Sequence, residues 1–252
     1  MSQKKWILGN WKMNGRLSSN AALLAQFAAL PVGEQVVAGI AAPMPYVPSL
    51  VTAFAQSAFL SGAQDLSQYA VDGAFTGEVS AAMLQDIGAD FVLVGHSERR
   101  QYFNEDHEVL RAKLINALAA GVTPVLCVGE PLEDRLAERQ NAVVADQLNV
   151  LNQLPTELVP AELIVAYEPV WAIGTGQVAS LAQIADMHEF IYAQILSKLE
   201  KTVKIRILYG GSVNADNARD IFCVSKVGGA LVGGASLSYE SFAHILKVAQ
   251  ES

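Results

Sequence analysis

The segment Trp6–Asn14 reads WILGNWKMN, a short apolar run followed directly by a polar turn. A continuous apolar run of this kind is typical of a strand that is buried on both faces of a parallel sheet. The turn lacks the Gly-x-Gly-x-x-Gly pattern that usually follows the first strand of an open, doubly wound nucleotide-binding sheet. The segment therefore favours a closed α/β barrel, with the open sheet as the alternative.

Similar apolar runs recur along the whole chain and alternate with helical patterns. The expected strands are Trp6–Gly9, Val36–Ala41, Phe59–Ala63, Phe91–Gly95, Val122–Val128, Leu163–Tyr167, Ile205–Tyr209 and Ala230–Val232. Helical segments are expected over Ala21–Leu30, Ser80–Gly88, His107–Gly121, Leu132–Leu154, Ala182–Leu199 and Tyr239–Gln250. Eight strand-then-helix units in 252 residues match a (β/α)8 TIM barrel, which is the predicted fold class.

Residues at the ends of these segments agree with their assignment as helices. Ser80, Ser180 and Asn214 are expected N-caps, because their side-chain oxygens can accept hydrogen bonds from a first helical turn. Gly88 and Gly121 stand where helices are expected to end. No linker-like change of composition divides the chain, so we predict a single TIM-barrel domain over residues 1–252.

The composition argues against several classes of protein. Hydrophobic residues make up 52% of the chain, which supplies a large core and argues against disorder. The 17 Lys and Arg against 25 Asp and Glu give a net charge of −8, which argues against broad binding to nucleic acid. No stretch reaches the roughly 20 apolar residues of a membrane span. Asn10 and Lys12 interrupt the first apolar run too early for a signal peptide, so a cytoplasmic location is expected.

The cysteines and histidines indicate neither a disulfide framework nor a metal site. Cys127 and Cys223 are too few for a framework and are expected to be reduced, buried thiols. The chain has no His-x-x-His pair or Cys/His cluster, so no metal ion is expected.

In a barrel of this kind, the chemistry lies at the carboxyl ends of the strands. Asn10 and Lys12 follow the first expected strand, Gln64 the third, His96 the fourth and Glu168 the sixth. A cation, an imidazole and a carboxylate thus share one rim, whereas chance would distribute them between the two ends of the barrel. We therefore predict an active site at this rim.

Glu168 is the candidate general base. It follows the apolar run Ile164–Tyr167 and precedes Pro169, which disfavours helical backbone at Glu168. Partial desolvation at such a strand end would suit a group that takes up and releases a proton. A solvated carboxylate at a strand end is the alternative interpretation.

His96 is the candidate partner of that base. It precedes Ser97–Arg100, which is expected to open a short helix, and the dipole at a helix start disfavours a charged imidazolium. A neutral imidazole that donates a hydrogen bond is therefore expected. His107, His188 and His244 fall in helical segments and are expected to be structural.

Two glycine turns follow the last two expected strands, at Gly210–Ser212 and at Gly233 and Gly234. Successive backbone N–H groups in such turns, together with a helix N-terminus, form an anion site. Phosphate commonly binds after strands seven and eight of these barrels. With Lys12 as a single cation, an acidic protein can therefore hold a phosphate group here.

The segment Pro169–Gly176 is mostly apolar, although a loop at this position lies at the surface. We expect it to close over the rim and exclude water. Packing against a neighbouring loop is the alternative.

Five motifs together resemble the triosephosphate isomerase family. They are Asn10–Asn14, Gly95–Arg100, Ala166–Gly176, Tyr209–Val213 and Leu231–Ser236, and the resemblance extends from Trp6 to Leu237. It implies an intramolecular aldose–ketose isomerase of glycolysis and gluconeogenesis. Such an enzyme interconverts dihydroxyacetone phosphate and D-glyceraldehyde 3-phosphate through an enediol(ate), with no cofactor and no metal ion.

The resemblance also implies a role for each matched residue. Glu168 would transfer the proton, His96 would polarise the carbonyl and shuttle hydroxyl protons, and Lys12 would stabilise the anionic charge. Asn10 would orient the substrate, and Glu98 would restrain Lys12. The phosphate would be bound by backbone N–H groups of Gly174, Ser212, Gly233 and Gly234.

The segment Gln64–Glu78 resembles the family's interdigitating loop and implies a homodimer. Thr76 of this loop would lie close to the partner subunit's Asn10 and the partner subunit's Lys12. The expected partners are thus a triose phosphate and a second copy of the chain, with no nucleic acid and no membrane. Four features depart from the family's commonest pattern without touching a proposed catalytic group: Asp65, Gln177, Ser238 and the segment Lys226–Gly229.

Two other functions fit the same barrel. A Schiff-base aldolase needs a lysine within an inner strand, whereas Lys204 precedes the seventh expected strand and the sixth presents Glu168. A phosphate-binding barrel without catalysis should lack at least one of Lys12, His96 and Glu168, and all three are present. Both alternatives are therefore disfavoured.

Overall fold

The computed structural model of the protein describes residues 4–173, 177–199 and 203–252. Within these ranges, eight parallel strands form one closed barrel in chain order. The strands are β1 Lys5–Asn10, β2 Val36–Ala42, β3 Phe59–Ala63, β4 Phe91–Val94, β5 Thr123–Val128, β6 Glu162–Tyr167, β7 Lys204–Tyr209 and β8 Val227–Val232. The barrel closes because β1 pairs in parallel with both β2 and β8. The predicted TIM-barrel class is confirmed, and an open sheet is excluded.

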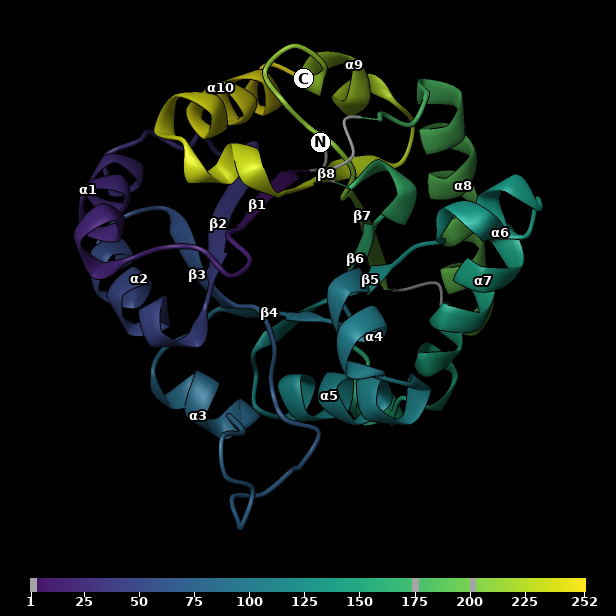
Figure 1. The fold of residues 1–252 in the computed structure, drawn as a ribbon, viewed down its shortest axis with the longest axis horizontal. Helices are drawn as coiled ribbons and strands as arrows, with labels where there is room; N and C mark the ends of the chain where they lie inside the picture. Colours follow the sequence, from purple (N-terminus) through teal and green to yellow (C-terminus); the bar gives the residue numbers. More distant parts are fainter. Residues whose placement is uncertain (1–3, 174–176, 200–202) are drawn as a thin grey trace.

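Helices surround the barrel, as the view along its axis shows (Figure 1). The α-helices in the described ranges are α1 Leu17–Ala28, α2 Val47–Phe54, α3 Ala81–Asp86, α4 Ser97–Phe103, α5 His107–Ala119, α6 Leu132–Leu136, α7 Gln140–Gln147, α8 Leu181–Lys198, α9 Ala218–Cys223 and α10 Tyr239–Gln250. Short 3-10 helices are η1 Met44–Tyr46, η2 Leu148–Gln153, η3 Thr156–Leu158, η4 Val170–Ala172 and η5 Gly234–Leu237. Among the described residues, no helix is both long enough and apolar enough to span a membrane.

Two apolar layers stabilise the barrel. Leu8 belongs to the layer that fills the barrel interior, whereas its neighbour Ile7 packs in the layer between strands and helices. Because neighbouring residues of one strand serve different layers, the strands are apolar without alternation. Gly62 shows how tightly the interior is filled, since a Cβ there would lie 2.3 Å from the ring of the fully buried Phe91.

Most of the predicted helix ends are confirmed. The hydroxyl of Ser80 caps α3 and that of Ser180 caps α8, each by accepting a hydrogen bond from the third residue of its helix. Gly88 and Gly121 adopt left-handed backbone, with φ of +82° and +74°, where glycine is favoured. The prediction for Asn214 is wrong: its side chain caps a turn, and α9 begins only after Asn217.

Several predicted elements have different bounds, and the first helix begins at Leu17 instead of Ala21. The helix expected over 132–154 is divided into α6, α7 and η2, and Glu138 between the first two has a left-handed φ of +57°. Strand β8 begins at Val227, three residues before the predicted Ala230. A Cβ at Gly229 would lie 1.9 Å from the carbonyl oxygen of Trp6, so the close approach of β8 to β1 requires this glycine.

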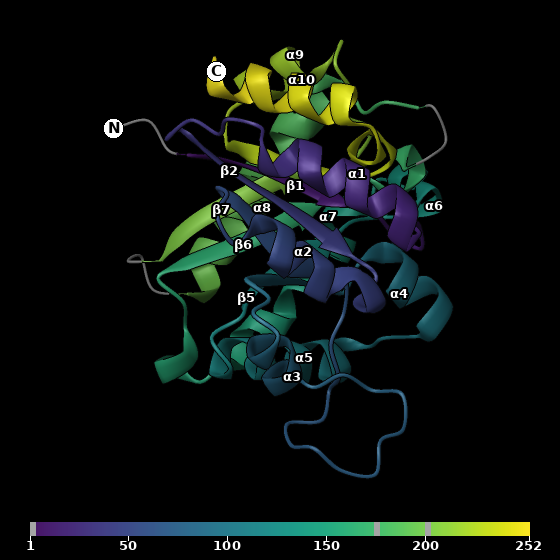
Figure 2. The ribbon, with the colours of Figure 1, turned by 90° about the vertical axis from the view of Figure 1, so that its left-hand side faces the viewer.

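The segment that joins β3 to α3 projects away from the barrel. It forms an extended loop below the body of the molecule in both views (Figures 1 and 2). Residues 68–78 are all exposed, so they do not pack against their own barrel. The loop therefore presents its side chains to the surroundings of the molecule.

Candidate active site

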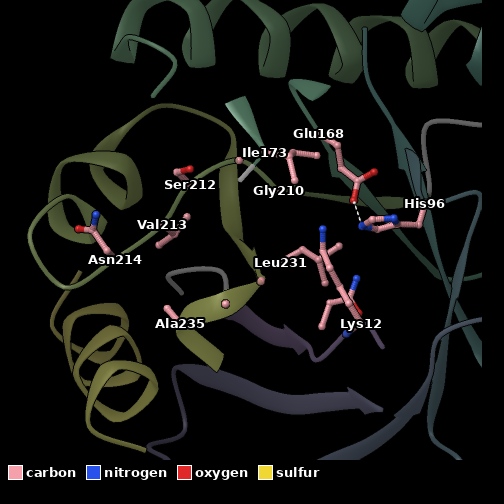
Figure 3. A pocket seen from close by; sticks show the side chains of 14 residues that line it. Lys12, His96, Glu168, Ile173, Gly210, Ser212, Val213, Asn214, Leu231 and Ala235 are labelled. Carbon is pink, nitrogen blue, oxygen red and sulfur yellow. Dashed lines mark hydrogen bonds and ion pairs between the residues drawn. The ribbon is translucent and has the colours of Figure 1, made fainter. Parts of the chain in front are cut away.

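A cavity of about 400 Å³ opens at the carboxyl ends of the strands (Figure 3). It is lined by Asn10, Lys12, His96, Glu168, Ile173, Gly210, Gly211, Ser212, Val213, Asn214, Leu231, Gly233, Gly234 and Ala235. The structure thus brings together most of the residues that the sequence singled out at this rim. Gly174, Thr175 and Gly176, which belong to the predicted closing loop, lie outside the described residues.

Glu168 stands at the end of β6 with its carboxylate directed into the cavity. Its backbone N–H donates to the carbonyl of Val128 on β5 at 2.7 Å. The carboxylate oxygen Oε2 accepts a hydrogen bond from the N–H of Ser97 at 2.9 Å, and Oε1 lies 3.1 Å from Nε2 of His96. Only 2% of Glu168 is exposed, so the alternative of a solvated carboxylate is excluded.

His96 is the N-cap of α4 and reaches Glu168 from β4. Its Nδ1 accepts a hydrogen bond from the N–H of Glu98 at 3.2 Å. In a neutral imidazole the proton must then be on Nε2, which is the nitrogen that faces Glu168. The backbone of α4 therefore selects the tautomer that donates into the cavity.

Lys12 lines the same cavity as His96 and has left-handed backbone, with φ of +52°. The side chain of Asn10 accepts a hydrogen bond from the Lys12 N–H at 3.0 Å, and the amide of Gln64 donates to the Lys12 carbonyl at 3.0 Å. The ammonium Nζ lies 2.5 Å from Oε1 of Glu98. Three polar side chains thus hold this unusual backbone and its cation in place. The contact between Lys12 and Glu98 is the one that the family resemblance implied.

The far end of the cavity is formed by the two glycine turns. Figure 3 shows Ser212 and Ala235 on one side and Glu168 and His96 on the other. Added Cβ atoms at Gly233 and Gly234 would meet no atom within 4 Å, so backbone there faces open space. The Ser212 hydroxyl donates to the carbonyl of Ala172 at 2.9 Å. The cavity therefore has one end that holds a carboxylate and an imidazole, and another end that exposes backbone.

Cys127 lies next to the Glu168 carboxylate and is fully buried. Burial raises the pKa of its thiol well above the usual value, and the neighbouring carboxylate of Glu168 raises it further. The thiol is therefore protonated at neutral pH and uncharged beside Glu168. Cys127 is a buried, free thiol as predicted, whereas Cys223 is free but exposed, so the prediction that it is buried was wrong.

Glu130 is a residue that the sequence reasoning missed. Its fully buried carboxylate accepts hydrogen bonds from the Tyr167 hydroxyl at 3.1 Å and from the Trp171 indole at 2.8 Å. Burial raises the pKa of Glu130, while these two donors lower it. The described start of the apolar loop thus packs against the loop after β5. A scan of the fifth strand's end for carboxylates would have found Glu130.

The other residues that the sequence singled out lie outside this cavity. Gln64 and Glu98 line a neighbouring cavity of about 500 Å³, and Lys12 and His96 separate it from the first. Thr76 is exposed in the projecting loop. Lys204 is exposed at the start of β7, at the opposite end of the strand from the cavity. Among the described residues, no group of three or more His, Cys, Asp or Glu side chains could hold a metal ion.

Comparison with known proteins shows the family of the chain. A sequence model of the family described as triosephosphate isomerase matches residues 5–249. A triosephosphate isomerase of Neisseria meningitidis is 54% identical over 255 residues, covering 100% of each chain. Those of Paracidovorax citrulli and Thiobacillus denitrificans are 47% and 45% identical and cover 99% and 98% of this chain. The chain therefore belongs to the triosephosphate isomerase family of aldose–ketose isomerases.

Proposed function

We propose that the protein interconverts dihydroxyacetone phosphate and D-glyceraldehyde 3-phosphate, with Glu168 as the group that moves the carbon-bound proton. The observation that carries the proposal is the 3.1 Å approach of Glu168 Oε1 to His96 Nε2 in one cavity. A base beside a hydrogen-bond donor is what proton removal next to a carbonyl requires. Relatives that are about half identical carry the name of this enzyme.

The proposed reaction moves one carbon-bound proton and one hydroxyl proton. The Glu168 carboxylate removes a proton from C1 of the ketose, and the electron pair moves onto the carbonyl oxygen to form an enediolate. His96 donates a hydrogen bond to that oxygen and transfers the hydroxyl proton between O1 and O2. The protonated Glu168 then returns a proton to C2, which gives the aldose. Lys12 offsets the negative charge, and Asn10 orients the substrate.

The phosphate would occupy the far end of the cavity. Backbone N–H groups of Ser212, Gly233 and Gly234 would bind it, together with that of Gly174, and Lys12 would supply the cation. This arrangement places the two ends of a small substrate at the two ends of a cavity of about 400 Å³. It requires neither a cofactor nor a metal ion.

The same proposal includes the cellular setting and the extent of the unit. The reaction would serve glycolysis and gluconeogenesis in the cytoplasm. Residues 1–252 would form a single domain, because one barrel accounts for nearly the whole described chain.

We also propose a homodimer in which the projecting loop of one copy enters the neighbouring cavity of the other. The loop exposes apolar side chains such as Val71, and Met13 at the rim of the receiving cavity is 95% exposed. Tyr102 and Phe103, which line the same cavity, are exposed as well. Clustered exposed apolar residues are typical of an interaction site. Thr76 would then approach the partner subunit's Lys12.

A coupled assay on D-glyceraldehyde 3-phosphate tests the proposed reaction. The wild type should be active, and Glu168→Asp should lose about a hundredfold in kcat, because its carboxylate is displaced by roughly 1 Å. Glu189→Asp, which shortens an exposed glutamate on α8, is the matched control and should retain full activity. Equal activity of the two variants would exclude Glu168 as the base. A covalent adduct trapped by borohydride would indicate Schiff-base chemistry instead.

A further inference from the structure

Arg100 connects the two strand ends that carry the proposed acid–base pair. It lies on α4, and its side chain runs back toward the barrel. Nε donates to the carbonyl of Gly95 at 2.8 Å, and Nη2 donates to the carbonyl of Cys127 at 2.9 Å. Gly95 immediately follows β4, and Cys127 belongs to β5. One guanidinium therefore bridges β4 and β5 where both strands reach the rim.

The first of these carbonyls belongs to the residue before His96. Gly95 has left-handed backbone with φ of +73°, and a Cβ there would lie 3.0 Å from Arg100 Nη2 and 3.1 Å from the methyl groups of Leu110. The turn that aims His96 into the cavity is thus packed directly against the guanidinium. A shift of Arg100 would change the support of this turn.

The second carbonyl belongs to the strand end that supports Glu168. Val128, the residue after Cys127, accepts the hydrogen bond from the Glu168 N–H at 2.7 Å. The thiol of Cys127 lies beside the Glu168 carboxylate, whose charge raises the thiol's pKa. Arg100 therefore donates to the carbonyl of the residue before His96 and to the carbonyl of the residue before Val128, which in turn accepts from Glu168.

Arg100 also brings a positive charge to this end of the cavity. In the part of the chain that the structure describes, no carboxylate lies within 4.0 Å of its guanidinium. Burial lowers the pKa of Arg100, and the charges of Glu168 and Glu105 oppose that effect. An arginine with two carbonyl acceptors and no direct carboxylate partner keeps its charge available to Glu168.

We propose that Arg100 is a positioning residue for the isomerase reaction, which fixes the separation of His96 and Glu168 by holding the ends of β4 and β5 together. This inference rests on the proposed function, since it assigns Arg100 to the same proton transfer. Arg100 does not line the cavity that would hold the substrate. It acts through the backbone that carries the two groups.

The test measures kcat and KM separately for the wild type, Arg100→Met and Arg100→Lys. Met retains much of the side-chain volume but no donor, and Lys retains a charge and a single donor group. Because misplacement by about 1 Å can cost a hundredfold, Arg100→Met should lower kcat by roughly 10- to 100-fold. KM should stay within about threefold, because the phosphate end is untouched. Arg100→Lys should recover part of the loss.

Arg206→Met is the matched control. Arg206 is a buried arginine that pairs with Glu162 and donates to the carbonyl of Lys4 at the opposite end of the barrel, whereas Arg100 is half-buried. Its replacement should lower the thermal midpoint and leave kcat per folded molecule unchanged. A general loss of stability would affect both variants alike, whereas a loss of positioning would affect only the Arg100 variants.

The outcomes distinguish this inference from the proposed function. A wild-type protein without isomerase activity would overturn the proposed function and this inference with it. An active wild type with an unchanged kcat in Arg100→Met, or a loss no greater than that of Arg206→Met, would overturn the inference alone. If Arg100→Met does not fold, Arg100→Lys decides, and an unchanged kcat in that variant would overturn the role of Arg100.

Discussion

The imidazole of His96 contacts the Glu168 carboxylate through one ring nitrogen and the backbone of α4 through the other. Nε2 of His96 lies 3.1 Å from Oε1 of Glu168, while Nδ1 accepts the N–H of Glu98 at 3.2 Å. The same helix start also donates from Ser97 to the other carboxylate oxygen of Glu168. The first turn of α4 therefore orients the imidazole and the carboxylate together.

This relationship predicts the effect of replacing the imidazole. His96→Asn removes the group proposed to transfer hydroxyl protons, and positioned general acids typically contribute about 10²- to 10⁴-fold. We expect kcat to fall by that amount and KM to change little. His244→Asn, on an exposed position of α10, is the control and should behave as wild type. Steady-state kinetics in both directions measure the effect, and normal turnover by His96→Asn would contradict it.

The phosphate end should respond differently from the acid–base end. A methyl group at Gly234 meets no protein atom within 4 Å, so Gly234→Ala should fold normally. The methyl group would occupy space beside the backbone N–H groups proposed to bind phosphate. We expect KM to rise by roughly tenfold with kcat nearly unchanged, which is the pattern of lost binding. A fall in kcat at unchanged KM would place the phosphate elsewhere.

The projecting loop carries its own internal support. The rings of Tyr69 and Phe75 stack with centroids 3.6 Å apart, although both lie in the exposed segment. A stacked aromatic pair contributes about 0.5–1.5 kcal/mol in addition to the burial of apolar area. The stack should therefore hold the loop in the conformation that enters a second copy. Tyr69→Ala should therefore raise the dimer dissociation constant by roughly 2- to 12-fold. Tyr69→Phe keeps the aromatic ring and should leave the dimer dissociation constant unchanged.

Sedimentation over a range of protein concentrations measures that dissociation constant. Gln68→Ala changes an exposed neighbour outside the stack and serves as the control. The homodimer proposal itself fails if the active wild type sediments as a single chain of 26.9 kDa.

Acid stability should depend on His188. This residue is fully buried on α8, and burial lowers its pKa from 6.5 to about 4, while the carbonyl of Lys226 opposes that effect. The folded state binds a proton on His188 less readily than the unfolded state does. The contribution of neutral His188 to the free energy of unfolding is therefore complete above pH 6.5. It is lost as the pH falls toward 4, by up to about 3 kcal/mol.

Urea unfolding of the wild type and His188→Gln between pH 7 and pH 4.5 isolates this contribution. The free energy of unfolding should fall more steeply with acid in the wild type than in the variant, and the two curves should converge. Parallel curves would show that His188 does not titrate on unfolding.

Much of the fold was predictable from sequence because buried parallel strands are apolar on both faces. Leu8 and Ile7 serve different layers, and their strand therefore appears as a continuous run. The same reasoning failed where no apolar signal exists. Gly228 and Gly229 extend β8 without side chains, and Glu138 interrupts a helical pattern through its backbone conformation alone.

The candidate site was predictable as far as it depends on strand ends. Asn10, Lys12, His96 and Glu168 were all found from their positions directly after apolar runs, and the structure gathers them around one cavity. The support around them was not predictable in this way. Which carbonyls Arg100 reaches depends on the separation of β4 and β5, and that separation is a property of the folded barrel.

In the proposed reaction, Glu168 carries a proton between two carbons and exchanges it with solvent. The most direct test monitors dihydroxyacetone phosphate in D₂O by NMR, with wild type and Glu168→Gln compared at equal concentration. The wild type should form an aldose that carries deuterium at C2, and the variant should show no exchange above buffer. Deuterium incorporation by Glu168→Gln at the wild-type rate would contradict the account.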